Sequence, residues 1–361
     1  RREAITRPRV AFKASGEAPR STSLMDANYY EPEFEPILLE SSIFVQMDTS
    51  QIYFRKYQAS EAENWDNFLQ ECKNFHFFFH RAYIEYHTDR FEDHSLMVYY
   101  RDKLIALLPA HRQAHTLCSH QGLSYGGFLS NHKMNISLML RIFQKMKEEA
   151  RHWGFEELLY KPVPYFHHKI AAQEDMYALR YFRGQIVQDH LYSICHLDQS
   201  PYYSRGKKGR INKSQKAGVE ITISQDYAAY WQLLETLLED RYQTQATHRL
   251  DEITYLAQKF PNHIKLFIAH RKGQLLGGSL VFENPSVVQA QYIASNEQGK
   301  ALGALALLFK ELTSHYQSSK KYLSLGHSRE NNELGFNPSL VQFKESLGAG
   351  TYVQSTYQLK F

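Results

Sequence analysis

The sequence contains few cysteines and no long hydrophobic run. Three cysteines, Cys72, Cys118 and Cys195, occur far apart in 361 residues. An odd number at such spacing is typical of reduced thiols rather than of a disulfide framework, and this favours a cytoplasmic protein. No stretch approaches the roughly 18 apolar residues that a membrane-spanning helix needs, so we expect no transmembrane segment.

The chain also has little net charge. Its formal charge of +4 is too small to indicate binding to nucleic acid or membrane by itself, and we expect no DNA partner. Hydrophobic residues make up 43% of the chain, which is enough to build the cores of two ordinary domains. Any binding of anions must therefore come from local clusters of basic residues.

The first fifty residues do not have the pattern of a folded segment. They contain four prolines and mixed charges without a sustained hydrophobic period, so we expect a disordered tail over residues 1–50. No apolar core follows the basic start, which argues against a signal peptide. The sequence begins with arginine, which suggests a fragment or a processed form. Whether residues 1–46 belong to the native protein stays open, and we expect the folded part to begin at Met47.

The most informative stretch runs from Val287 to Gly326 and predicts a strand, a turn, an amphipathic helix and a second strand. Such a junction presents unpaired backbone N–H groups and the positive end of a helix dipole, which together favour an anion. Gly299, Lys300 and Gly303 lie at this turn. The sequence allows either a pyrophosphate-binding turn or an ordinary unit in which the glycines serve packing.

The same order of elements occurs twice. Three landmarks recur at separations of 165 to 170 residues: Trp65 and Trp231, Arg101 and Arg271, and the pairs Ser130-Asn131 and Ser295-Asn296. We interpret this as a tandem duplication of one α/β unit, with a first domain over 51–190 and a second over 191–361. Each is expected to be a mixed central sheet flanked by helices. The predicted strands are 52–57, 96–100, 104–110, 122–129, 157–160, 219–223, 265–269 and 275–282, and the predicted helices of the first copy are 60–73 and 135–153.

The two copies differ at the predicted turn. The first copy has no glycine after Ser130-Asn131, whereas the second has Gly299 and Gly303, so we expect one anion site, in the second copy. Between the copies, residues 204–216 carry six basic residues and no acidic one. This segment could bind phosphates or a nucleic acid backbone, or it could be a solvated basic helix.

Four passages resemble the Fem-like branch of the GNAT acyltransferase superfamily, in which two GNAT-type domains stand in tandem. They are the basic run ending at Val219, the hairpin 266–282, the strand Gln291 to Ser295 with its helix, and the ending Phe343 to Ala349. The resemblance covers residues 52–361. It implies transfer of an acyl or aminoacyl group to an amine.

The resemblance leaves two donors open. Ordinary GNAT enzymes take acetyl-CoA and hold its pyrophosphate with the signature Gln/Arg-x-x-Gly-x-Gly/Ala. The segment Gln298 to Gly303 has the glutamine and two glycines, but at a different spacing. Fem ligases take aminoacyl-tRNA and a peptidoglycan precursor, and the basic segment would suit such a donor or a phosphate-bearing acceptor.

Several residues become candidates for the site of this reaction. For donor binding they are Ile293 and Ala294, whose backbone could stabilise an oxyanion as the splayed strand of GNAT folds does, with Gln298, Gly299, Lys300 and Gly303. For acceptor binding they are Arg210, Lys213, Arg241 and Tyr242. For acid–base chemistry they are Tyr292, Glu330 and Lys344. Each has a plainer interpretation: Tyr292 as a packing residue, Glu330 as a loop carboxylate, Lys344 in a surface ion pair and Arg241 as a helix-ending cation.

No metal site is predicted. Cys72, His76 and His80 recur every four residues, but the intervening phenylalanines indicate that the helix ends before they could share a face. We therefore expect an N-acyltransferase that uses acetyl-CoA or another acyl-CoA without a metal. Its acceptor would be an amine on a small molecule or on a lipid-linked or nucleotide-linked envelope precursor. The alternatives are a tRNA-dependent Fem-type ligase and a non-catalytic binding protein on a degenerate GNAT fold.

Overall fold

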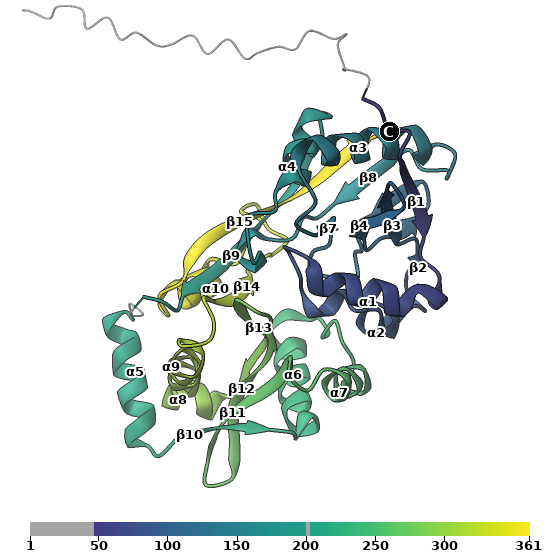
Figure 1. The fold of residues 1–361 in the computed structure, drawn as a ribbon. Helices are drawn as coiled ribbons and strands as arrows, with labels where there is room; N and C mark the ends of the chain where they lie inside the picture. Colours follow the sequence, from purple (N-terminus) through teal and green to yellow (C-terminus); the bar gives the residue numbers. More distant parts are fainter. Residues whose placement is uncertain (1–46, 200–202) are drawn as a thin grey trace, which may run out of the picture. The chain divides into compact units, whose positions relative to one another are not determined.

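The computed structural model describes residues 47–199 and 203–361 (Figure 1). The prediction of a disordered tail falls on residues 1–46, which lie outside the described residues. Residues Met47–Phe361 form one unit by their internal contacts. Strand β9 runs without a break from Gln185 to His196, across the expected domain boundary at residue 190, so that boundary stays a prediction.

The described helices and strands follow the order expected from the repeat, which confirms the α/β fold class. The first half contains β1 (Ile52–Lys56), α1 (Ala62–Glu71), α2 (Arg81–Ile84), β2 (Glu92–Asp93), β3 (Leu96–Tyr100), β4 (Lys103–Leu108), β5 (His111–Gln113), β6 (Thr116–Cys118), β7 (Leu129–Ser130), α3 (Ile136–Ala150), β8 (Glu157–Tyr160), α4 (Glu174–Tyr181) and β9.

The second half repeats this plan after a connecting helix. It contains α5 (Arg205–Lys216), β10 (Glu220–Ser224), α6 (Tyr227–Tyr242), α7 (Leu250–Lys259), β11 (Ile264–Arg271), β12 (Gln274–Glu283), β13 (Val287–Ser295), α8 (Glu297–Leu302), α9 (Ala304–Tyr316), β14 (Tyr322–His327), α10 (Pro338–Glu345) and β15 (Gly350–Lys360). In each half a strand and two helices come first, and a helical segment, a strand, a further helix and a last strand close the half. Between them the second half has the meander β11, β12 and β13, to which β3, β4 and β7 of the first half correspond, and the first half also has β2, β5 and β6.

The sheets join the two halves through their last strands. One sheet has the order β1-β3-β4-β7, and the other has the order β10-β11-β12-β13-β14-β9-β15-β8-β6-β5-β2. Strand β9 of the first half pairs with β14 of the second, whereas β15 of the second half pairs with β8 of the first. The halves therefore exchange their terminal strands and share one continuous sheet (Figure 1).

The two repeated tryptophans lie in one hydrophobic core. Trp65 of α1 and Trp231 of α6 are fully buried in the same cluster, which brings together α1, α2, α6 and α7 with the faces of both meanders. Burial of such large side chains contributes strongly to stability. The landmark that revealed the repeat in the sequence is thus part of the contact between the halves.

One predicted strand is largely wrong. Residues 122–128 are irregular, and only Leu129–Ser130 pair as a strand. Gly127 has a φ of +80°, which interrupts an extended backbone. The Phe128 N–H donates to the hydroxyl of Tyr160 at 2.6 Å instead of to a neighbouring strand. In the sequence, a run of buried apolar residues looks the same whether it forms a strand or an irregular segment held by hydrogen bonds to side chains.

Candidate functional site

Strands β13 and β14 are parallel neighbours that separate along their length. They pair only over Val287–Gln289 and Tyr322–Ser324. A register shift between Leu280 and Val281 of β12 bends β13 where the separation begins. Beyond Gln289, no other strand in the described ranges pairs with this edge of β13. Backbone polar groups on the edge are therefore available to hydrogen-bond a ligand.

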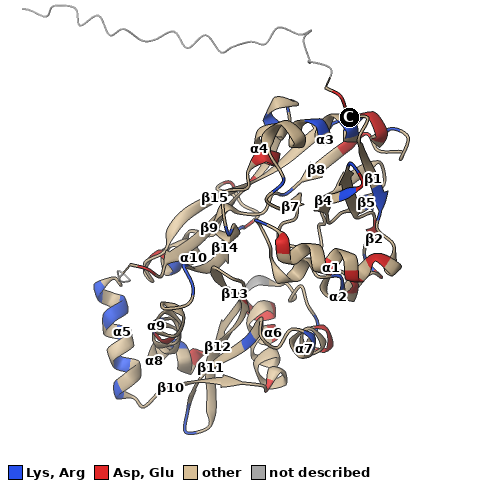
Figure 2. Ribbon diagram, in the orientation of Figure 1, with Lys and Arg blue, Asp and Glu red and all other residues tan. Residues whose placement is uncertain are grey.

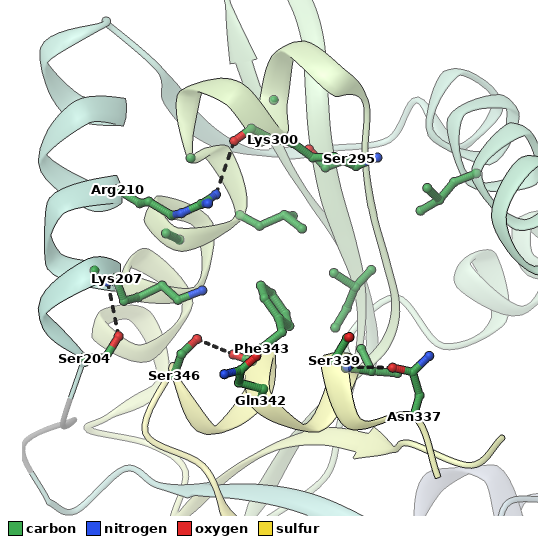
Figure 3. A pocket seen from close by; sticks show the side chains of 18 residues that line it. Ser204, Lys207, Arg210, Ser295, Lys300, Asn337, Ser339, Gln342, Phe343 and Ser346 are labelled. Atoms are coloured by element: carbon green, nitrogen blue, oxygen red, sulfur yellow. Dashed lines mark hydrogen bonds between the residues drawn. The ribbon is translucent and has the colours of Figure 1, made fainter. Parts of the chain in front are cut away.

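A cavity of about 800 Å³ lies beside this separation (Figure 3). Ile293 and Ser295 of β13 form part of its wall, and helices α5, α8, α9 and α10 supply most of the remainder. A volume of this size is typical of sites for cofactors and extended small molecules. The expected donor turn is thus part of the cavity, together with elements that are distant in the sequence.

The first turns of three helices line the cavity. At α5 the capping side chain of Ser204 accepts from the N–H of Lys207 at 3.3 Å, and at α10 that of Asn337 accepts from the N–H of Leu340 at 2.8 Å. Helix α9 contributes Leu305 and Ala306 of its first turn. Gly303, the C-cap of α8, and Ser346, the C-cap of α10, line the same space. Both ends of helix dipoles therefore lie at the cavity, and the dipoles alone do not select the charge of a ligand.

The charged side chains around the cavity have one sign. Lys207, Arg210 and Lys300 line it, and no aspartate or glutamate is among the described residues that do so. The Lys300 ammonium pairs with Glu297, an exposed side chain, at 2.5 Å. Arg210 donates to the carbonyl of Lys300 at 3.5 Å. The cavity thus combines helix N-termini with cationic side chains.

Packing and backbone conformation explain why both residues of the predicted turn are glycines. A Cβ at Gly299 would lie 2.1 Å from the carbonyl oxygen of Leu276, because α8 packs closely on β12. Gly303 has a φ of +79° and separates α8 from α9, so the expected single helix is two helices. A Cβ there would lie 2.8 Å from the carbonyl oxygen of Arg210. Both residues line the cavity, and their contact with a ligand stays a prediction.

Two further candidates, Gln298 and Lys213, are not among the described residues that line the cavity. Gln298 is exposed on α8 and Lys213 is exposed on α5. The N–H of Gly299 is already bonded to the side chain of Asn296, at 2.8 Å. The side chains of Arg241 and Tyr242, at the end of α6, lie outside the described part of the structure.

Tyr292 and Ile293 face opposite sides of the sheet, as strand alternation predicts. Ile293 faces the cavity, whereas Ala294 and Tyr292 belong to the core shared by the two halves. The hydroxyl of Tyr292 lies 2.7 Å from Nδ1 of His248, and Nε2 of His248 lies 3.2 Å from the hydroxyl of Tyr83. Burial raises the pKa of Tyr292. Tyr292 thus belongs to a buried tyrosine–histidine–tyrosine chain between the halves, on the face away from the cavity lining.

Glu330 and Lys344 lie near the cavity without lining it. Glu330 is exposed in the loop after β14, and its carboxylate accepts from the side chain of Asn337 at 3.2 Å. Lys344 is 2% exposed, so the surface ion pair considered for it is wrong. Its ammonium donates to the carbonyls of Gly326 and His327 and to the hydroxyl of Ser328. Burial lowers the pKa of Lys344 to about 7.

Sequence reasoning missed Lys207 and the helix α10. Lys207 was one of six basic residues, and its buried position follows from a helix face that also buries Ile211 and Ser214. The spacing of 207, 211 and 214 was a usable signal. Helix α10 contributes Asn337, Ser339, Leu340, Gln342, Phe343 and Ser346 to the cavity. Its short, polar sequence gave no comparable signal.

Among the described residues, no group of three or more histidine, cysteine, aspartate or glutamate side chains is arranged to hold a metal ion. Helix α1 ends at Glu71, so Cys72, His76 and His80 do not share a helix face. In the same ranges, no helix is long and apolar enough to cross a membrane. All three cysteines are buried free thiols.

The duplicated meander, the separated strands and the cavity at their opening agree with the tandem GNAT-like fold that the sequence resemblance predicts. The structure is similar to that of FemX, with a TM-score of 0.62, 10% identity, and coverage of 86% of this chain and 97% of that one. The resemblance to the Fem-like GNAT fold is thereby confirmed as a likeness of fold.

Two further solved structures share the fold. A conserved protein of unknown function from Bacteroides thetaiotaomicron has a TM-score of 0.57 and 12% identity, covering 85% of this chain and 98% of that one. L-PGS from Bacillus licheniformis has a TM-score of 0.54 and 12% identity, covering 85% and 92%. No model of a known sequence family matches the chain, and no curated protein sequence matches it.

Proposed function

We propose that this protein is an N-acyltransferase that moves an acyl group from acyl-CoA to an amine of a small molecule or a cell-envelope precursor. The observation that carries the proposal is the cavity beside the opening of β13 and β14. It combines an unpaired strand edge, three helix N-termini and three basic side chains, with no acidic residue among those that line it. An acyl thioester attached to a phosphorylated nucleotide fits these features.

The reaction would take place at the strand edge. The neutral amine attacks the thioester carbonyl carbon, the C–N bond forms, and the oxyanion accepts hydrogen bonds from backbone N–H groups of β13 near Ile293 and Ala294. The C–S bond then breaks, and the thiolate of CoA leaves and takes up a proton. These backbone groups need no side chain, which agrees with the apolar residues at both positions.

The proton of the attacking amine needs a base outside the immediate lining, because no described lining residue is a carboxylate or histidine. Glu330 is the candidate, because its hydrogen bond to Asn337 links it to a residue of the lining. We propose that Glu330 receives this proton directly or through water. Lys344 is a positioning residue in this proposal, because it holds the end of β14 in place.

A second function has its own support. Helix α5 carries Arg205, Lys208, Lys213 and Lys216 on exposed positions, and Figure 2 shows the blue segments along this helix. A row of exposed cations suits the backbone of a tRNA, so an aminoacyl-tRNA-dependent ligase is the alternative. The absence of a carboxylate or histidine among the described lining residues keeps a third candidate, a non-catalytic binding protein.

Titration with acetyl-CoA and with tRNA, followed by melting temperature, separates these functions. A ligand at about a hundred times its dissociation constant adds about 2.7 kcal/mol to the stability of the folded state. The proposal expects a shift with acetyl-CoA or a longer acyl-CoA at micromolar protein. A shift with tRNA alone would favour the ligase, and a CoA shift without transfer to any amine would favour a binding protein.

A further inference from the structure

Lys207 is a buried cation with no protein partner of opposite charge. Its side chain is 7% exposed, on the inner face of α5, and points into the cavity (Figure 3). The ammonium lies 4.3 Å from the ring centre of Phe343. Within the described ranges it makes neither a hydrogen bond nor a salt bridge through Nζ. Lysines are rarely buried unless they are paired with an opposite charge, so the buried ammonium of Lys207 lacks the partner that such a position usually has.

The surroundings of Lys207 add positive electrostatic potential and supply no negative charge that would compensate its ammonium. Burial, with a smaller contribution from the neighbouring Arg210, lowers the pKa of Lys207 to about 8. Lys207 belongs to the first turn of α5, and the dipole of that helix also disfavours a cation. An anion from a ligand would relieve each of these costs.

The direction of the Lys207 side chain is fixed by packing. One turn further along α5, the backbone of Arg210 lies against Gly303, and its guanidinium donates to the carbonyl of Lys300. The side chain of Phe343 in α10 covers the Lys207 ammonium from the other side. A site that holds its cations before the ligand arrives loses little entropy on binding.

We infer that Lys207 and Arg210 form a subsite for the phosphate or diphosphate group of a small-molecule ligand. The inference rests on the proposed function, in which that ligand is the acyl donor. Phosphate groups offer several oxygens to several donors at once, which suits two cations beside helix N-termini. An enclosed ammonium favours a slender phosphorylated molecule over RNA, whose backbone would meet the exposed lysines of α5 first.

Binding of ADP and of adenosine tests this subsite, because the two probes differ only in the diphosphate. We expect the wild-type protein to bind ADP more tightly than adenosine. Lys207→Met should weaken ADP binding on the order of tenfold to a hundredfold and leave adenosine binding unchanged. Lys207→Arg should retain most of the preference for ADP. Lys208→Met is the matched control, since Lys208 is adjacent, exposed and outside the cavity lining.

The pH dependence gives a second readout. Lys207 must be protonated to bind an anion, so the affinity for ADP should fall as the pH rises through the pKa of about 8. Between pH 7.5 and 9.5, where the terminal phosphate is already ionised, we expect a loss of about tenfold. Lys207→Arg should abolish this loss, because arginine keeps its charge throughout the range.

Three results would overturn the subsite: ADP affinity that Lys207→Met leaves intact, an equal loss in Lys208→Met, or a Lys207→Met effect on a single-stranded RNA instead of on ADP. Other results distinguish a failure of the subsite from a failure of the proposed function. If ADP binds through Lys207 but no acyl-CoA is bound or consumed, the phosphate subsite stands and the acyl-CoA donor is wrong. If acyl-CoA is bound and consumed equally well by Lys207→Met, the donor stands and the subsite is wrong.

Discussion

The ammonium of Lys344 donates a hydrogen bond to the hydroxyl of Ser328, at 2.9 Å, across the gap between α10 and the end of β14. The same ammonium also reaches the carbonyls of Gly326 and His327, at 3.0 and 2.8 Å. One buried side chain thus ties a cavity helix to one of the two separating strands.

Replacing Lys344 by methionine should destabilise the protein by ~1–3 kcal/mol, because the acceptors around it lose their donor and Ser328 is fully buried. Chemical denaturation measures the change. Lys321→Met serves as the control, since Lys321 is exposed and its side chain has no described partner. Equal stability of the two variants would show that the three hydrogen bonds contribute nothing.

Lys344 should also make stability depend on pH in the alkaline range. Its pKa is about 7 in the folded protein, against 10.5 for an ordinary lysine. Between these values the unfolded chain binds more protons, so the free energy of unfolding rises with pH, by up to ~1.4 kcal/mol per pH unit. Urea denaturation at pH 7, 8 and 9 should show a steeper rise in the wild type than in Lys344→Met. Parallel pH curves would show that the pKa of Lys344 is not lowered in the folded protein.

The stability of the protein at acidic pH tests His248, whose side chain links Tyr83 to Tyr292. Burial lowers its pKa from 6.5 to about 4, and His87 and Arg90 add to the effect. The unfolded chain then takes up a proton that the folded one does not, so this stability is present above pH 6.5 and is lost as the pH falls towards 4.

We expect the wild type to lose more stability than His248→Gln between pH 7 and pH 4.5, by on the order of 3 kcal/mol at most. Denaturation curves at the two pH values give the comparison. Glutamine keeps a donor and an acceptor but does not titrate in this range. An equal acid loss in His248→Gln and the wild type would show that His248 titrates with an ordinary pKa in the folded protein.

A comparison of Gly303 with Gly273 tests why the second copy carries a glycine between two helices. Both have positive φ, +79° and +77°, but a Cβ at Gly273 would meet no atom within 4 Å, whereas one at Gly303 would meet Arg210. Gly273→Ala should cost ~1 kcal/mol through the backbone alone.

Gly303→Ala should cost at least ~1 kcal/mol more than Gly273→Ala, because α5 must also move away. Thermal or chemical denaturation of the two variants gives the difference directly. Equal costs would mean that α5 does not pack against Gly303 as the structure has it.

The sequence predicted most of the fold because its signals were local. The short runs rich in apolar residues in β3, β11 and β12 indicated the elements, and the repeated tryptophans indicated the duplication. The exchange of β9 and β15 between the halves had no such signal, since strand partners are chosen by tertiary packing. The break at Gly303 was hidden because an apolar stripe continues through both helices.

The candidate site was only partly predictable for the same reason. Ile293, Lys300 and Gly303 lie in one stretch, and the structure places all three at the cavity. Lys207 and the residues of α10 come from segments that are distant in the chain. Their convergence depends on how α5 and α10 pack on the second half, and no single stretch of sequence contains that information.

The most direct test of the central claim is the melting-temperature shift by acetyl-CoA in a variant whose cavity is filled. Ser339 is exposed and lines the cavity, so Ser339→Trp should fill it without disturbing the core, and Ser318→Trp adds the same side chain at an exposed position outside the lining. The account predicts a shift of several degrees in the wild type and in Ser318→Trp, and none in Ser339→Trp. An equal shift in all three proteins would contradict a donor site in this cavity.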